Sequence, residues 1–321
     1  VVQDVLEGQF SLSATGSLAY IPGGAQASQN RLVWVNRNGA EQPLAAPARD
    51  YYQPRLSPDG RRVAVDIGDQ IWLYDVARDT LTRFTFEGAL NQYPTWTPDG
   101  RRIAFMSNRE GSFNLFWQLA DGGGGLERLL TAKTNNVPFS WSSNGQLLSF
   151  VDTSSSAAPG IWVLRMSDRK AQPFLQTPAF EDAPQFSPDG RWLAYASNES
   201  GRREVYVRPY PGPGGKWQIS TEGGNEPLWN RNGRELFYRT GDKMMAVEIS
   251  TEPSFTAGKP RQLFEGHYQL TGLGRANYDV SPDGQRFLML KPVEQEQAPP
   301  TQIDVVLNWT EELKRLVPPG K

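Results

Sequence analysis

A four-residue phrase that ends in glycine recurs along the whole chain of 321 residues. Successive closing glycines lie 40 to 51 residues apart. Proline presets one corner of a tight turn and glycine takes its left-handed position, so each phrase predicts a turn. A repeat of this length built from short strands indicates a β-propeller. Four copies end in Pro-Asp-Gly: Ser57–Gly60, Thr97–Gly100, Ser187–Gly190 and Ser281–Gly284. Three copies are degenerate: Ser13–Gly16, Ser142–Gly145 and Asn230–Gly233.

Each turn is followed by β-rich segments in a fixed order, as the second repeat illustrates. Residues 54–57 are extended before the turn, and 63–67, 70–75 and 80–84 follow it. These four segments predict an antiparallel meander of strands A to D. The sequence therefore predicts an all-β, seven-bladed propeller of four-stranded antiparallel blades. A six-bladed ring is the alternative if the first or the seventh repeat is not a true blade.

The seventh repeat is incomplete, because its third strand at 303–307 is followed by a helical pattern instead of a fourth strand. Residues 309–316 predict a short C-terminal helix with Asn308 as its N-cap. The start of the chain resembles the D-strand endings, so we expect residues 1–7 to pair near Val305 and close the ring. This arrangement predicts a single propeller domain over residues 1–321.

Composition limits the function classes. A formal net charge of −2 argues against a general nucleic-acid binder. The absence of cysteine excludes disulfides, zinc–thiolate sites and cysteine nucleophiles. No apolar run approaches the roughly 18 residues of a membrane span, and no signal peptide is present. Because the chain starts at Val1, we expect it to be an excised portion of a longer protein.

The segments that cross from one blade to the next precede the innermost strands, so we expect them to surround the mouth of the central channel. The Pro-Asp-Gly turns would then share the opposite face. Tyrosine beside amides and carboxylates is typical of a polar ligand pocket. The candidate ligand-binding residues are Tyr51, Tyr52, Asn91, Tyr93, Asn135, Glu181, Asp182, Asn225, Glu226, His267 and Arg275.

Catalytic residues are few. His267 is the only histidine, and one histidine cannot build a multi-histidine metal site. It could serve a triad, but no Gly-x-Ser-x-Gly motif is present. Glu181 and Asp182 could bind calcium together with backbone carbonyls; no other cofactor is predicted. The residues favour a noncatalytic binding or sensing module whose channel mouth takes a protein, peptide or small polar ligand. The alternatives are a propeller hydrolase or lyase that uses carboxylates and His267, and a structural scaffold.

Two longer segments, Pro94–Phe105 and Pro184–Tyr195, resemble the repeat of TolB-type propellers, and this likeness extends over essentially the whole chain. The opening 10–23 and the close 305–314 are similar to the C-terminal propeller of certain bacterial serine/threonine protein kinases and related sensors. That resemblance implies an extracytoplasmic module, periplasmic or at the cell surface, whose parent protein is membrane-anchored. The kinase motifs His-Arg-Asp and Asp-Phe-Gly do not occur in this chain.

Overall fold

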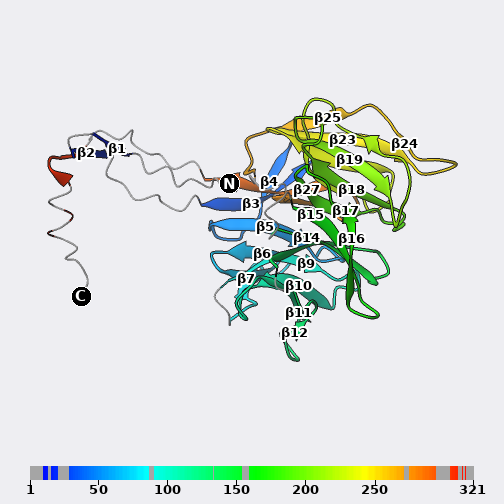
Figure 1. Ribbon diagram of the computed structural model, residues 1–321, viewed down its shortest axis with the longest axis horizontal. Coiled ribbons are helices and arrows are strands. Elements are labelled where there is room, and N and C mark those ends of the chain that lie inside the picture. Colours follow the sequence, from blue (N-terminus) through cyan, green and yellow to red (C-terminus); the bar gives the residue numbers. More distant parts are fainter. Residues whose placement is uncertain are drawn as a thin grey trace. The chain divides into compact units, whose positions relative to one another are not determined.

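The computed structural model describes residues 10–13, 16–20, 29–86, 90–132, 134–153, 159–270, 275–293, 304–309, 313 and 315. The chain divides into two compact units, one formed by Gln29–Pro292 and the other by Val1–Ser28 with Val293–Lys321. Each unit is described by itself, and Figure 1 labels their strands. The division into two units does not test whether residues 1–321 form a single domain, which stays a prediction.

The larger unit is a propeller of six antiparallel blades (Figure 1). Between the fifth and sixth blades the hydroxyl of Tyr278 donates to the carbonyl of Glu226, and the innermost strands of the other neighbouring blades contact one another. The first three blades are β5 (Tyr51–Leu56), β6 (Arg62–Ile67), β7 (Gln70–Asp75) and β8 (Thr80–Arg83); β9 (Asn91–Trp96), β10 (Arg102–Ser107), β11 (Asn114–Leu119) and β12 (Glu127–Arg128); and β13 (Asn136–Trp141), β14 (Leu147–Asp152), β15 (Gly160–Arg165) and β16 (Lys170–Leu175). The fourth and fifth are β17 (Glu181–Phe186), β18 (Trp192–Ser197), β19 (Glu204–Pro209) and β20 (Trp217–Gln218); and β21 (Asn225–Trp229), β22 (Glu235–Thr240) and β23 (Lys243–Ser250), which pairs with both β24 (Thr256–Ala257) and β25 (Arg261–Glu265).

The sixth blade closes the ring with strands from both ends of the unit. Its inner strands β26 (Tyr278–Val280) and β27 (Arg286–Pro292) are continued by β3 (Asn30–Asn36) and β4 (Glu41–Pro43). β27 and β3 pair over seven residues, from Arg286 opposite Asn36 to Pro292 opposite Asn30. The last two strands of the first repeat therefore complete the blade begun by the seventh repeat.

The remaining strands of those two repeats form the smaller unit, and this is why the ring has six blades. β1 (Phe10–Leu12), β2 (Leu18–Tyr20) and β28 (Asp304–Val306) make a separate three-stranded sheet. The six-bladed alternative is confirmed, and the seven-bladed expectation is not. The predicted closing strand 1–7 lies outside the described residues, and Val305 pairs with Ala19. Of the predicted helix 309–316, Trp309, Leu313 and Arg315 are helical, and the rest lies outside the described residues.

The repeated phrase forms the same turn between strands A and B of successive blades. In the first blade Ser57 donates from Oγ to Asp59 (2.6 Å), and the backbone N–H of Arg61 donates to the same carboxylate oxygen (3.1 Å). Gly60 has φ +71°, and a Cβ there would lie 3.0 Å from Pro282 of the sixth blade. The aspartates thus serve the turn, and this glycine also permits the close approach of two blades.

The hydrophobic core lies between adjacent blades. One cluster combines Leu32 and Leu288 of the sixth blade with Tyr51, Val63 and Tyr74 of the first. Such wedges bury aromatic and β-branched side chains from both partners, so each blade is stable only against its neighbours. Over the residues that the structure describes, no helix is both long and apolar enough to cross a bilayer.

Candidate functional site

The six innermost strands enclose a cavity of about 430 Å³ on the channel axis. The last two residues of each of these strands line the cavity, and they form two sets: the penultimate residues and the final residues. The first set is mixed in polarity and the second is apolar and at most 8% exposed. The first set is Arg55, Thr95, Ser140, Gln185, Leu228 and Asp279; the second is Leu56, Trp96, Trp141, Phe186, Trp229 and Val280.

The A–B turns form the rim of this cavity, which we call the funnel. Pro58, Pro98, Ser143, Pro188 and Arg231 line it, one from each of the first five blades. The turns therefore lie on one face of the propeller, as the sequence predicted. The accessible cavity opens on this face, whereas the sequence placed the ligand residues at the crossover end.

Arg55 and Asp279 supply the charge inside the funnel. Arg55 donates from Nη1 to the carbonyl oxygens of Ala276 (2.8 Å) and Tyr278 (3.3 Å). Asp279 accepts hydrogen bonds from the backbone N–H groups of Leu56 and Val280, both at 2.7 Å. Burial lowers the pKa of Arg55 and raises the pKa of Asp279, and the attraction between the two charges opposes both shifts.

Arg275 crosses the channel at its crossover end. It precedes β26 in the sixth blade, and its guanidinium carbon lies 3.4 Å from the ring centroid of Tyr93 and 4.3 Å from that of Phe139. These rings belong to the second and third blades, on the far side of the ring. Arg275 is only 6% exposed, and Phe139 also lines the funnel. Arg275 and the two rings therefore form a plug that makes the funnel blind.

Two buried carboxylates accompany the plug. Asp66 accepts from the backbone N–H of Tyr93 at 3.0 Å, and its other oxygen has no hydrogen-bond partner within the described residues. Burial raises the pKa of Asp66 to about 8. Burial also raises the pKa of Asp182 to about 6, against the attraction of Arg203, which donates to it. Burial lowers the pKa of Arg275 to about 9, while Tyr93 and both carboxylates favour its charge.

Several residues that the sequence selected gather around this plug. Tyr93, Asp182 and Arg275 interact there, and Arg203 links Asp182 to Asn225. The buried members of the predicted set are Tyr51, Asn91, Glu181, Asp182, Glu226 and Arg275; the half-buried ones are Tyr52, Tyr93, Asn135 and Asn225. Their role as ligand contacts stays a prediction.

Other predicted residues lie apart from the plug. The hydroxyl of Tyr51 donates to the carbonyl of Pro47 (2.6 Å) within an inter-blade core. His267 is 83% exposed, and its Nδ1 lies 3.8 Å from Asp242. His267 therefore lies at the surface of the propeller.

The proposed calcium pair does not converge. Glu181 and Asp182 are consecutive in β17, so their side chains point to opposite faces of the strand. Glu181 accepts from the hydroxyl of Thr177 (2.8 Å), whereas Asp182 faces Arg203. Across the described part of the chain, no three His, Asp or Glu side chains gather in a group that could hold a metal ion.

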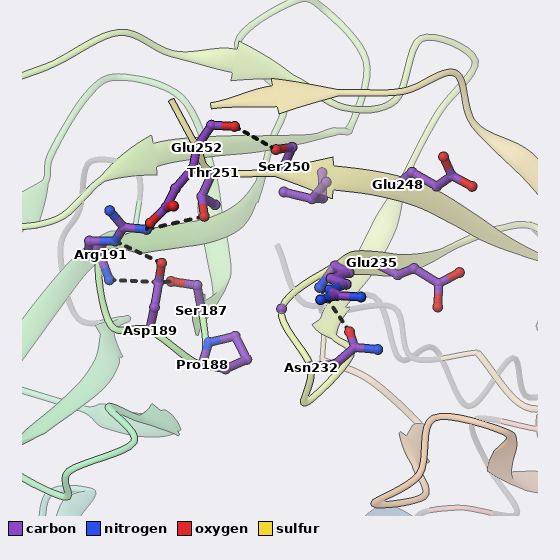
Figure 2. A pocket seen from close by; sticks show the side chains of 13 residues that line it. Ser187, Pro188, Asp189, Arg191, Asn232, Glu235, Glu248, Ser250, Thr251 and Glu252 are labelled. Carbon is purple, nitrogen blue, oxygen red and sulfur yellow. Dashed lines mark hydrogen bonds and ion pairs between the residues drawn. The ribbon is translucent and has the colours of Figure 1, made fainter. Parts of the chain in front are cut away.

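A second, wider cavity of about 1030 Å³ lies between the A–B turns of the fourth and fifth blades and the end of β23. Figure 2 shows Arg191 on one wall, directed toward Asp189 (2.9 Å) and Thr251 (3.2 Å). On the other wall Glu235 is paired with Arg37 at 2.5 Å, and the pKa of Glu235 is lowered by that contact despite partial burial. The charges of Arg191 and Glu235 in this groove are already paired.

The sequence did not select the funnel residues. Its glycines and prolines drew attention to the turns only as structural elements. One signal was present, because Arg231 occupies the position that proline holds in the four intact copies of the phrase.

Comparisons with known proteins agree with this architecture. The model of the TolB β-propeller domain matches residues 9–158. A protein TolB homolog of Chlorobium luteolum is 29% identical over 140 residues, which are 42% of this chain and 30% of that protein. An uncharacterized peptidase, YuxL, of Bacillus subtilis is 22% identical over 195 residues, which are 45% of this chain and 29% of the peptidase. The matches thus span about 30% of the length of these curated relatives.

Solved structures share the fold. A structure described as TolB from Agrobacterium tumefaciens has a TM-score of 0.70 and 16% identity, and covers 84% of this chain and all of that one. An oligogalacturonate lyase in complex with manganese has a TM-score of 0.54 and 12% identity, over 84% of this chain and 99% of the lyase. At these identities the likeness concerns the fold alone.

Proposed function

Because the chain folds as a TolB-type β-propeller, we propose that it is a noncatalytic binding module that holds a segment of a protein or peptide in the funnel. The funnel is the observation that carries this proposal. Its volume of about 430 Å³ lies within the range of about 300–1,000 Å³ typical of ligand pockets. Its walls combine tryptophans with a few convergent polar groups, which is the composition of recognition sites.

The blind end of the funnel favours a segment over a threaded chain. Phe139 and Arg275 close the channel behind the ring of polar residues, so a ligand enters and leaves by the turn face. The rim prolines Pro58, Pro98 and Pro188 are rigid, so the opening is preorganised and a ligand loses little binding energy in ordering it.

The groups within the funnel suit binding better than catalysis. Asp279 is engaged by two backbone N–H groups. Ser140 shares a hydrogen bond with Ser149 (2.8 Å) and accepts one from the backbone N–H of Phe186. Neither side chain has a base or nucleophile beside it among the described lining residues, and His267 is at the surface. These contacts favour a binding module over the hydrolase or lyase alternative.

The proposal includes a protein partner and an extracytoplasmic location. Both rest on the resemblance to TolB-type propellers and to the sensor modules of bacterial kinases. Fractionation of cells that express the parent protein, followed by immunoblotting, would test the location. Recovery of the protein in the cytoplasmic fraction would contradict it.

A single engineered cysteine tests the funnel directly, because the chain contains none of its own. Peptides that bind the wild-type protein are first selected from a phage-displayed heptapeptide library. The variant Gln185→Cys is then labelled with a bulky maleimide and tested for capture of these peptides. We expect the label to abolish capture of the selected peptides. Ser250→Cys, which lines the second cavity instead, is the matched control and should retain capture. Equal capture by both labelled proteins would contradict the proposal.

A further inference from the structure

The rim of the funnel carries one charged side chain among the described lining residues, and its position points to the class of ligand. We infer that the segment held in the funnel is acidic and that Arg231 is the residue that selects it. This inference rests on the proposed function, because it concerns the ligand of the same cavity.

Arg231 stands where the repeat elsewhere has a small or rigid residue. The second position of the turn is proline in four blades and Ser143 in the third. In the fifth blade the degenerate phrase Asn230–Gly233 places an arginine there, and Arg231 lines the funnel. A long cationic side chain at one point of a rigid rim is suited to reach a ligand as it enters.

The guanidinium of Arg231 is held at present by neutral acceptors. It reaches the first blade, where it donates to the carbonyl oxygens of Pro58 and Ser57. Carbonyl groups do not neutralise its charge, and the residue is exposed. A ligand carboxylate would replace these contacts with two parallel hydrogen bonds to an oppositely charged group, the bidentate geometry that the guanidinium fork matches. The side chain can therefore exchange its two carbonyl partners for a ligand carboxylate.

The charges around the funnel favour an anion. Two arginines, Arg55 and Arg231, line it against one carboxylate, Asp279, which already has two backbone donors. Asp66, whose pKa burial raises to about 8, is not among the lining residues of the funnel. An acidic group beside an apolar side chain matches both the arginines and the tryptophan walls.

The second cavity has the opposite balance. Asp189, Glu235, Glu248 and Glu252 line it against Arg191 and Arg234 (Figure 2). Arg234 follows Arg231 by three residues in the same turn and is also exposed, but it lines only this second cavity. Arg234 is therefore a matched control for the loss of one exposed arginine.

The test uses selection and then affinity. Phage-displayed heptapeptides are selected on the wild-type protein, on Arg231→Ala and on Arg234→Ala. We expect enrichment of Asp and Glu on the wild-type protein and on Arg234→Ala, but not on Arg231→Ala. The best wild-type binder is then synthesised with its acidic residue and with the corresponding amide. The acidic form should bind the wild-type protein about tenfold more tightly by fluorescence polarisation, and Arg231→Glu should reverse that preference.

Two results would overturn the inference in different ways. Equal affinity of the acidic and amide peptides, with capture still abolished by the label at Gln185→Cys, would contradict the acidic ligand and leave the funnel as the site. If the label does not affect capture of the selected peptides, the funnel is not their binding site. That result would contradict both the proposed function and this inference.

Discussion

The guanidinium of Arg275 stacks on the ring of Tyr93 with 3.4 Å between its central carbon and the ring centroid. Arg275 belongs to the sixth blade and Tyr93 to the second, so the contact spans the channel. Most hydrogen bonds in the propeller join strands of one blade, whereas this pair connects blades that are not neighbours. It fixes the depth of the funnel and holds a charge in a nearly dry position.

Arg275→Ala should destabilise the propeller by about 3 kcal/mol, because it leaves the carboxylate of Asp182 buried with less compensation. Urea unfolding at neutral pH would measure the change. Arg234→Ala removes an exposed arginine and should alter stability by less than about 0.5 kcal/mol. Equal stability of the two variants would show that the plug contributes little.

The pKa of Asp66 makes stability depend on pH. Its folded pKa of about 8 exceeds the ordinary value of 3.8, so between these values the folded state binds more protons than the unfolded state. The contribution of Asp66 is therefore complete below about pH 4 and is lost as the pH rises toward 8. The slope from this residue approaches roughly 1.4 kcal/mol per pH unit.

Asp66→Asn provides the measurement of that contribution. Free energies of unfolding at several pH values between 4 and 8 should depend less on pH in the variant than in the wild-type protein. Parallel profiles for the two proteins would mean that Asp66 is ionised in the folded state.

Substitutions at two glycines distinguish the free-energy cost of a left-handed backbone conformation from the cost of a steric clash between blades. Gly60 and Gly190 both have φ +71°, but an added Cβ meets Pro282 at 3.0 Å in the first case and nothing within 4 Å in the second. Gly190→Ala should cost about 1–2 kcal/mol from the left-handed conformation alone. Gly60→Ala should cost more, and thermal unfolding of both variants would reveal the difference. An equal loss would indicate that the blades separate freely at this point.

Ring closure by β3 and β4 predicts where the propeller can be shortened. Residues 29–292 contain all six blades and should unfold cooperatively when expressed alone. Residues 44–292 lack β3 and β4, leave β27 paired with β26 alone, and should lose cooperative unfolding. Circular dichroism during heating would compare them. Cooperative unfolding of the shorter chain would contradict closure at β27.

The turn chemistry and the order of strands within a blade were predictable because both depend on local sequence. Blade number was not, since it depends on which strands pair across distant parts of the chain. The segment of β3 has the apolar, β-branched composition of a strand, but nothing local indicates that its inner neighbour is β27 of the last repeat and not the second strand of its own repeat.

The candidate site was harder to predict because the inner strands are irregular. Gln53, Tyr93, Ala183 and Glu226 each precede proline and have positive φ, between 54° and 64°, and the pairing register shifts at these points. Such bulges redirect side chains, so the alternation of a regular strand does not give their direction. Tyr93 and Asp182, which were expected at an open mouth, instead lie beside Arg275.

The seven-residue seam between β27 and β3 also has a consequence for synthesis on the ribosome. Asn30 is synthesised long before Pro292, its partner across the seam. Until Pro292 emerges, the nascent chain holds five assembled or partly assembled blades with an unpaired strand at one edge. Such an edge can recruit a strand from another chain, and the long separation slows the last step. Correct folding of this protein therefore depends on how long that edge stays unpaired.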